Sequence, residues 1–189
     1  GVSAEAAVRI ARGVMDWRRA RTGMLTTNYA EAGGFIRSSA AESAPDLQLH
    51  FVIGKLVDHG RKTALGHGYS SHVCLLQPRS RGRVALARAD PMALPLVDPN
   101  FLADEDDLQR MVRGVRRMRA ILSQPALADL GGKELPVSAS AQTDVEIEQF
   151  IRRYADTSYH PVGSCRMGPG PMDVVDAARI AAIHQTESR

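Results

Sequence analysis

The sequence is short of several kinds of residue, and each shortage excludes a class of protein. Its 189 residues include only two cysteines, Cys74 and Cys165, whereas a small secreted disulfide scaffold is rich in them. No apolar run approaches the roughly 20 residues that a membrane-spanning helix needs. The N-terminal residues have neither the basic start nor the apolar stretch of a secretory signal. We therefore expect a cytoplasmic chain with two free thiols and no transmembrane segment.

Aromatic residues and excess charge are also scarce. Phe, Trp and Tyr together make up 5% of the chain, which leaves few side chains on which nucleic-acid bases could stack. The 24 basic residues exceed the 21 acidic ones by a net charge of only +3, which attracts polyanions weakly. The arginines of residues 104–122 are expected to form the solvated face of a helix. The sequence thus predicts no nucleic-acid partner.

What remains is the composition of a globular protein, with 44% hydrophobic and 24% charged residues. Three segments have the periodicity of an amphipathic helix. The first is residues 3–23, in which Val8, Ala11 and Met15 share a face. The other two are residues 104–122, with acids at the start and arginines in the later turns, and residues 143–154, which begin with a capping box.

Strand periodicity is clearest in residues 47–53. Apolar side chains alternate there, so His50 is expected on the accessible face of the strand, opposite to Leu47 and Leu49. Residues 26–44 are interpreted as a turn-rich stretch and residues 57–70 as a loop.

Two further strands are predicted at residues 71–77 and 83–88, joined by a turn at 78–82 into an antiparallel hairpin. Strands follow one another here, with helices around them rather than between them. The predicted fold class is therefore α+β, with an antiparallel β-sheet flanked by helices.

Several motifs that would define a chemistry are missing. No Gly-x-Gly-x-x-Gly string lies between a strand and a helix, so the chain has no dinucleotide-binding fingerprint of its own. There is no phosphate-binding loop and no Gly-x-Ser-x-Gly nucleophile motif. His160 and Cys165 lie five residues apart without a second pair of ligands at the spacing of a zinc site. The sequence therefore predicts no metal site.

Six histidines are the remaining candidates for proton transfer, because an imidazole exchanges protons near neutral pH. Most of them are expected to be structural or merely exposed. His160 differs because it lies in Tyr159–Gly168, where proline restricts the backbone and glycines allow a ligand or another domain to approach closely. His160 is therefore a candidate catalytic residue, although residue types alone define no reaction.

The stretch Tyr159–Gly168 resembles the His-Pro-Val-Gly-Thr-Cys-Arg-Met-Gly signature of the glucose–methanol–choline (GMC) oxidoreductase family. Other blocks resemble the same family in the right order, so that the resemblance covers about residues 24–176. These blocks are residues 28–35, 45–51, 80–84, 98–101, 124–127 and 155–159.

This resemblance implies a two-domain enzyme in which one domain binds FAD and the other, an antiparallel sheet flanked by helices, covers the flavin and forms the alcohol pocket. Residues 1–176 look like the substrate-binding domain without its FAD-binding domain, and residues 177–189 look like a divergent or truncated tail. The chain is therefore expected to be inactive on its own.

The resemblance also implies roles for single residues. His160 matches the active-site histidine, which takes or stabilises the alcohol proton while hydride moves to flavin N5. His50 and Tyr159 are expected to contact the substrate, and Val162 and Gly163 are expected to lie near the flavin. The family's second catalytic His or Asn has no counterpart here.

The implied partners are an alcohol or choline-like substrate, FAD, and the FAD domain of the same enzyme. A substrate domain without its FAD domain is expected to expose an apolar face, through which it could form a homodimer. The full enzyme could be cytoplasmic or membrane-associated. His-Pro-Val-Gly at residues 160–163 looks closer to the alcohol dehydrogenases than to the choline dehydrogenases. The alternative function is a free-standing module that binds a small molecule or a protein without catalysis.

Overall fold

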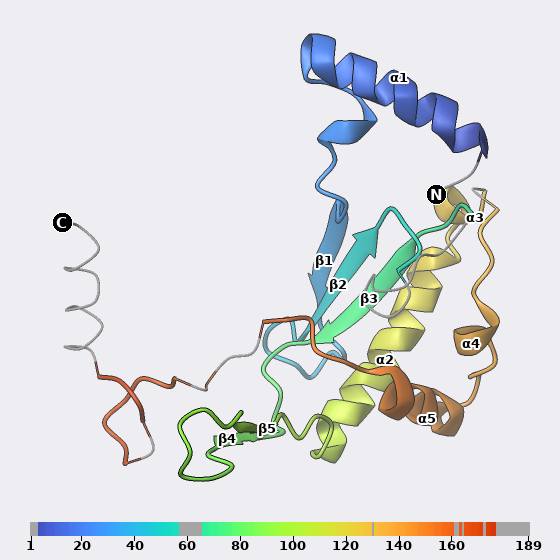
Figure 1. Cartoon of the computed structure of the whole chain (residues 1–189). Coiled ribbons are helices and arrows are strands. Elements are labelled where there is room, and N and C mark those ends of the chain that lie inside the picture. The colour runs from blue at the N-terminus through green and yellow to red at the C-terminus, as the bar shows by residue number, and fades with distance from the viewer. Residues whose placement is uncertain are drawn as a thin grey trace. The chain divides into compact units, whose positions relative to one another are not determined.

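A computed structural model describes residues 4–56, 66–129, 131–160, 163, 165–171 and 173–176 (Figure 1). The chain divides into two compact units, each described here by itself. The first unit comprises residues 1–79 and 104–154, and the second comprises residues 80–103 and 155–189. No helix among the described residues is both long enough and apolar enough to cross a bilayer.

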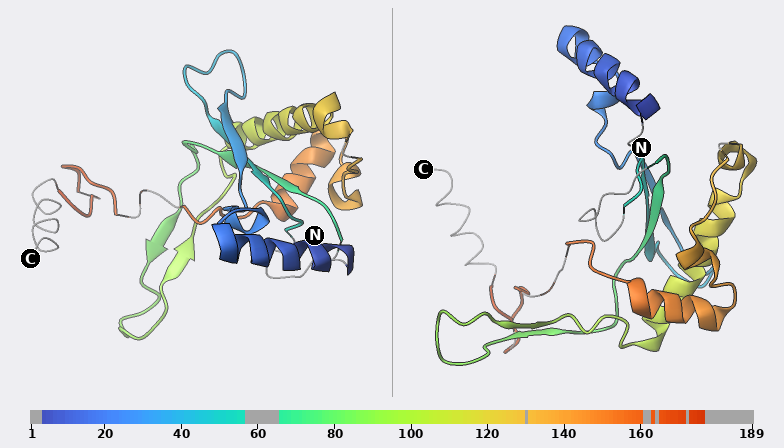
Figure 2. Two further views of the ribbon diagram at one scale, coloured as in Figure 1. Left: turned by 90° about the horizontal axis from the view of Figure 1, so that it is seen from above. Right: turned by 45° about the vertical axis from the view of Figure 1, so that its right-hand side comes forward.

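The first unit is built on a three-stranded antiparallel sheet of β1 (Ala32–Ile36), β2 (Leu47–Val52) and β3 (Ser70–Leu75), in that order. In the register, Leu47 of β2 pairs with Ile36 of β1 and with Leu75 of β3. Helices α2 (Glu105–Leu122) and α5 (Asp144–Tyr154) lie on one side of this sheet (Figure 2). The α+β fold class is thereby confirmed.

The core of the first unit lies between β2 and the two helices. Its fully or nearly fully buried apolar side chains include Leu47, Leu49, Leu108, Val112, Met118, Ile147 and Ile151. Helix α2 approaches the sheet closely at Gly114, where an added Cβ would lie 2.6 Å from Cγ1 of Val73. A larger residue at this position would push the helix away from the sheet.

Helices α2 and α5 both begin where local sequence signals predict. The side chain of Asp104 caps α2 by accepting a hydrogen bond from the backbone N of Asp106. At the start of α5, Thr143 and Glu146 form the predicted capping box, in which each side chain accepts a hydrogen bond from the other's backbone N–H, at 3.3 and 2.8 Å. The short helices α3 (Pro125–Ala128) and α4 (Pro136–Ala139) lie between them and were not predicted.

Helix α1 (Ala4–Ala20) is followed by the 3-10 helix η1 (Met24–Thr26). The predicted helix is present, and its Gly13 lies against Met24. The face defined by Val8 and Met15 is 50–59% exposed. This part of the chain therefore has an apolar helix face that the described residues leave open to solvent.

The second unit contains a two-stranded antiparallel sheet of β4 (Arg83–Ala85) and β5 (Leu96–Asp98). The predicted hairpin of residues 71–77 with 83–88 is therefore wrong, because β3 pairs with β2 and β4 pairs with β5. Strand β3 ends at Leu75, before the predicted end at residue 77, because Gln77 adopts a left-handed φ of 50° that interrupts the extended backbone.

Strand β1 was missed and falls within the segment expected to be turn-rich. It consists largely of residues with a low strand propensity, two of them glycines. Gly33 has a physical reason to be there, since an added Cβ would lie 2.5 Å from the carbonyl oxygen of Leu49 in the neighbouring strand. Most of the predicted loop 57–70 lies outside the described residues.

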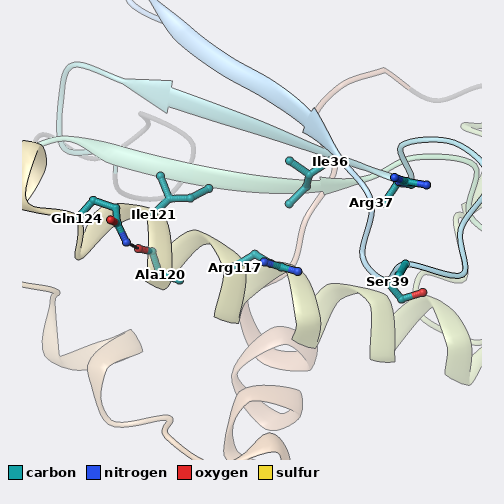
Figure 3. A pocket seen from close by; sticks show the side chains of 8 residues that line it. Ile36, Arg37, Ser39, Arg117, Ala120, Ile121 and Gln124 are labelled. Carbon is teal, nitrogen blue, oxygen red and sulfur yellow. Dashed lines mark hydrogen bonds between the residues drawn. The ribbon is translucent and has the colours of Figure 1, made fainter.

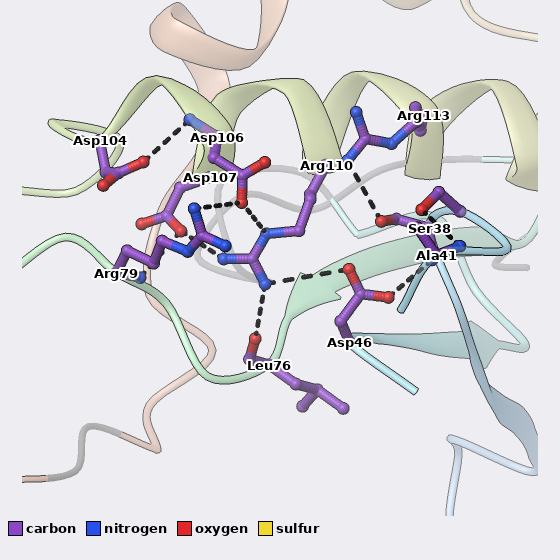
Figure 4. A network of polar contacts seen from close by, with 11 residues as sticks. Ser38, Ala41, Asp46, Leu76, Arg79, Asp104, Asp106, Asp107, Arg110 and Arg113 are labelled. Atoms are coloured by element: carbon purple, nitrogen blue, oxygen red, sulfur yellow. Dashed lines mark hydrogen bonds and ion pairs between the residues drawn. The ribbon is translucent and has the colours of Figure 1, made fainter. Parts of the chain in front are cut away.

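A buried ionic network ties α2 to the sheet (Figure 4). Its centre is Arg110, 4% exposed, whose guanidinium donates to Asp107 at 2.6 Å and to the carbonyl oxygen of Leu76 at 3.3 Å. The same guanidinium pairs with Asp106 at 3.1 Å and with Asp46 at 3.8 Å. One side chain of α2 thus holds the end of β3 and the turn that precedes β2.

The network also joins the two ends of the excursion, which is the segment of residues 80–103 that leaves the first unit and returns to it. The carboxylate of Asp107 accepts a hydrogen bond from the backbone N of Arg79 at 2.9 Å, and the Arg79 side chain lies 3.4 Å from Asp106. The chain leaves the first unit after Arg79 and returns at Asp104. Both ends of the excursion are therefore fixed to the first turn of α2.

Asp46 gives the network a dependence on pH. Burial pushes the pKa of Asp46 upward, but hydrogen bonds from Ser38 and the charge of Arg110 outweigh it, so this pKa lies below its ordinary value. The ionised carboxylate therefore stabilises the fold above the ordinary carboxyl pKa of about 4, and this contribution is lost as the pH falls through the lowered value.

We expect Asp46→Asn to lower the free energy of unfolding at pH 7, and we expect a smaller difference in this free energy between variant and wild type at pH 3. Urea unfolding at both pH values measures this, and an equal difference at both would contradict it.

Candidate functional site

One face of the three-stranded sheet lies away from α2 and carries polar side chains. Because directly paired residues share a face, the register places His50 of β2 between Gly33 of β1 and His72 of β3. The next row on this face contains Phe35, Gln48 and Cys74. His50 is half-buried, on the face opposite to Leu47 and Leu49, as the alternation predicts.

The row of Gly33, His50 and His72 brings two imidazoles next to each other. Directly opposed residues of an antiparallel pair have Cβ atoms about 5 Å apart. On the other side of His50, the directly paired residue is Gly33, which has no side chain. This arrangement can bind a small hydroxyl or carbonyl group through one or two ring nitrogens.

His72 was not predicted as a site residue. Alternation alone does not identify it, because the residue that lies beside His50 depends on which strand pairs with residues 47–53. The predicted pairing of 71–77 with 83–88 pointed to a different neighbour, which is why the sequence did not reveal the pair.

The second group of candidate residues follows α5, in the second unit. Here Asp156 accepts a hydrogen bond from the backbone N of Thr157 at 2.7 Å, and Oγ1 of Thr157 accepts one from the backbone N of Tyr159 at 2.9 Å. Tyr159 has a left-handed φ of 64°, a conformation that non-glycine residues adopt only when their surroundings fix it. The turn ends on His160, which is exposed.

Val162 and Gly163 were both expected to lie near a flavin. Gly163 is described by the structure, and Val162 lies outside the described residues. Gly163 has a φ of 91°, and an added Cβ there would have no heavy atom of the described residues within 4 Å. A flat ring can approach such a backbone closely, so this position fits contact with a flavin ring. The described residues hold no cluster of three His, Cys, Asp or Glu side chains that could bind a metal.

The rest of the signature is held by an ion pair. Arg166 pairs with Asp173, whose other carboxylate oxygen accepts a hydrogen bond from the backbone N of Gly170 at 2.6 Å. The hydrogen bond from Gly170, followed by that from Arg166, lowers the pKa of Asp173 below its ordinary value. The Asp173 carboxylate therefore stays ionised to a lower pH than an ordinary aspartate does.

The sequence-predicted site residues fall in two places. His50 lies on the sheet face that points away from α2 in the first unit, whereas Tyr159, His160 and Gly163 lie on the signature loop of the second.

Comparison with known proteins decides the family. The sequence profile described as "GMC oxidoreductase" matches residues 78–183, which is more than half of the chain. This chain belongs to the GMC oxidoreductase family. The resemblance given by Tyr159–Gly168 is thereby confirmed.

Curated relatives of this GMC oxidoreductase chain are dehydrogenases. It is 48% identical over 156 residues to an "Alcohol dehydrogenase [acceptor]" from Pseudomonas putida, covering 82% of this chain and 28% of the relative. It is 40% identical over 165 residues to "Choline dehydrogenase, mitochondrial" from Mus musculus, covering 86% and 28%. The chain thus spans less than a third of the length of these relatives.

Solved structures show the same fold. Pyridoxine 4-oxidase from Mesorbium loti matches with a TM-score of 0.64 and 27% identity, covering 79% of this chain and 30% of that one. A formate oxidase matches with a TM-score of 0.65 and 22% identity, covering 83% and 32%. The antiparallel sheet with helices on one side is therefore an architecture shared with these two solved proteins.

Proposed function

We propose that this GMC chain is the substrate-binding portion of an FAD-dependent dehydrogenase that oxidises the CH–OH group of an alcohol or a choline-like substrate. The observation that carries the proposal is the presentation of His160. Two side-chain hydrogen bonds hold the preceding turn, and Tyr159 is kept in a left-handed conformation, so that the imidazole is exposed within the family's signature.

His160 would act on the substrate hydroxyl. Bound FAD would supply the acceptor for the hydride that leaves the carbinol carbon. An alcohol becomes a better hydride donor as its oxygen gains alkoxide character, and a positioned imidazole promotes this by accepting the hydroxyl proton. Because His160 follows the fixed Tyr159 turn, its backbone position is set before the substrate binds.

The other candidate residues would position the two reactants. His50, with His72 beside it and no side chain at Gly33, would bind the substrate on the sheet face that points away from α2. Tyr159, 58% exposed, would contact the substrate next to His160. Gly163 and Val162 would lie against the flavin ring, where small residues leave room for it.

The partner would be the FAD domain of the same enzyme, because the chain has no phosphate-binding fingerprint and its relatives are more than three times as long as the matched region. The second unit also exposes large apolar side chains. Leu86, Met92 and Leu94 are each at least 85% exposed, which is the behaviour of an interface rather than of a free surface. The thiols of Cys74 and Cys165, neither of which is in a disulfide, support a reducing, cytoplasmic location.

The isolated 189-residue chain is expected to oxidise no alcohol, whereas the complete reading frame that contains it is expected to do so. The measurement is reduction of an artificial electron acceptor with choline and a series of primary alcohols as substrates. Turnover by the isolated chain would contradict the division of labour proposed here. If the complete protein is also inactive with every substrate but binds one of them, the function is that of a binding module without catalysis.

A further inference from the structure

A pocket of about 300 Å³, called the arginine pocket below, lies between α2 and the segment that follows β1. It is lined by Ser38, Arg113, Arg116 and Arg117, all of which belong to the first unit and none of which belongs to the candidate site. Figure 3 shows Arg117 pointing from α2 toward the segment after β1, where Ser39 lies, and Figure 4 shows Arg113 beside Ser38. Guanidinium groups therefore dominate the chemistry of this pocket.

Arg113 and Arg117 differ from the other arginines of α2 because they have no acidic partner among the described residues. The others are each in an ion pair: Arg110 with Asp107, Arg116 with Asp144, and Arg119 with Glu134. Arg113 and Arg117 are four residues apart, so they lie on the same side of the helix, where two like charges destabilise it. An anion bound between them would remove this repulsion.

Arg113 is already held in place by buried groups. Its Nη2 donates to Oγ of Ser38 at 3.3 Å, and the backbone N of Ser38, a residue that is 5% exposed, donates to Asp46 at 2.6 Å. Nε of Arg113 is buried and makes no hydrogen bond with the described residues. A guanidinium that is partly withdrawn from water attracts an anion more strongly than a hydrated one, because the effective dielectric constant around it is lower. The orientation and the desolvation of Arg113 are therefore set before an anion binds.

The charge of the surroundings restricts which anion fits. Arg117 makes no hydrogen bond or ion pair with the described residues, and it also borders a groove that contains Arg37. The polar contact of Arg37 is a hydrogen bond to the backbone oxygen of Glu42 at 3.2 Å, which neutralises no charge. A phosphate monoester carries a charge of about −1.5 to −2 at pH 7 and has three strong acceptor oxygens, whereas a carboxylate carries a single charge. The unpaired guanidinium groups therefore match a phosphate better than a carboxylate.

We propose that the arginine pocket binds the phosphate group of a phosphorylated molecule, with Arg113 and Arg117 donating to the phosphate oxygens. Arg116 stays paired with Asp144 and contributes to the wall of the pocket. The proposal goes beyond the proposed function and does not depend on it, because the pocket shares no residue with the groups that would act on the alcohol.

The test measures the binding of inorganic phosphate and of glycerol 3-phosphate to the 189-residue chain by isothermal titration calorimetry. Both should bind, and acetate at the same ionic strength should bind at least tenfold more weakly. Arg117→Gln should weaken phosphate binding at least tenfold. Because Arg117 has no polar partner among the described residues, circular dichroism of this variant should match that of the wild type. The matched control Arg12→Gln, which removes an exposed arginine of α1, should bind phosphate as the wild type does.

Two further measurements identify the source of the phosphate and the state of the pocket in the longer protein. Co-sedimentation with phosphatidylcholine vesicles that contain phosphatidic acid, lost in Arg117→Gln, would assign the phosphate to a lipid headgroup. Binding of glycerol 3-phosphate without co-sedimentation would assign it to a soluble molecule. The same calorimetric titration of the complete protein should give the same affinity as the 189-residue chain.

Four outcomes would overturn the proposal. They are no binding of phosphate in any of these forms, equal binding of acetate, equal affinities of Arg117→Gln and Arg12→Gln, and binding by the 189-residue chain that is absent from the complete protein. In the last case another part of the polypeptide would neutralise the arginines. None of these readouts depends on catalysis, so loss of alcohol oxidation by the complete enzyme would contradict the proposed function and leave the phosphate site standing.

Discussion

Replacing His160 by alanine in the complete enzyme should lower kcat/KM for its alcohol substrate by about 10²–10⁴-fold, the range of general acid–base catalysis. The reason is that the variant has no group on the signature loop to accept the hydroxyl proton as the hydride leaves. Steady-state rates with an artificial acceptor measure the effect. The rise of kcat/KM with pH that an essential base produces should disappear in the variant.

His67→Ala is the matched control, because His67 is an exposed histidine outside the candidate site. It should leave kcat/KM and its pH dependence unchanged. The visible absorption of the bound flavin should be the same in both variants, which separates loss of proton transfer from loss of the cofactor. A His160→Ala enzyme that retains wild-type rates and a wild-type pH profile would contradict the assignment.

Arg110→Ala should lower the free energy of unfolding by about 3–5 kcal/mol, the effect of breaking a buried ion pair by removing one partner. Arg110 faces the carboxylates of Asp46, Asp106 and Asp107, and Asp107 is fully buried. Without the guanidinium, the ionised carboxylates would remain in the interior with too few partners. Urea unfolding of the 189-residue chain at pH 7 measures the loss.

Arg116→Ala is the control for this prediction, since Arg116 is on the same helix but makes an exposed ion pair with Asp144 at 2.6 Å. Its loss should cost no more than about 1 kcal/mol. The prediction fails if the two variants are equally stable.

The predictable parts of the fold are those fixed by local chemistry. Helices α2 and α5 lie where the sequence predicts them because their first turns carry their own caps, Asp104 and the Thr143–Glu146 pair. Strand β1 was missed because it contains two glycines, and the close approach of another strand that accounts for Gly33 is not visible in any local pattern. The wrong partner for β3 has the same origin, since Arg110 and Asp107 hold the chain at Leu76 and Arg79 from 28 to 34 residues away.

The positions of the candidate residues in the fold were predictable to a similar extent. Alternation alone placed His50 on the accessible face of its strand, and the signature alone singled out His160. His72 could not be found before the pairing of β2 with β3 was known. The left-handed conformation of Tyr159 could not be predicted from the sequence either. The Asp156 and Thr157 side chains accept backbone hydrogen bonds in this turn, but residues of these types adopt several other turn conformations as well.

The contacts of Arg79 with Asp106 and Asp107 affect which sequence changes residues 80–103 can tolerate. Residues 80–103 leave and re-enter the first unit at adjacent points that are already tied together. Because the entropy of closing a loop grows only slowly with its length, the excursion can be shortened, extended or exchanged at little thermodynamic expense to the first unit. It is therefore a site at which evolution, or an engineer, can graft new recognition elements onto an unchanged scaffold.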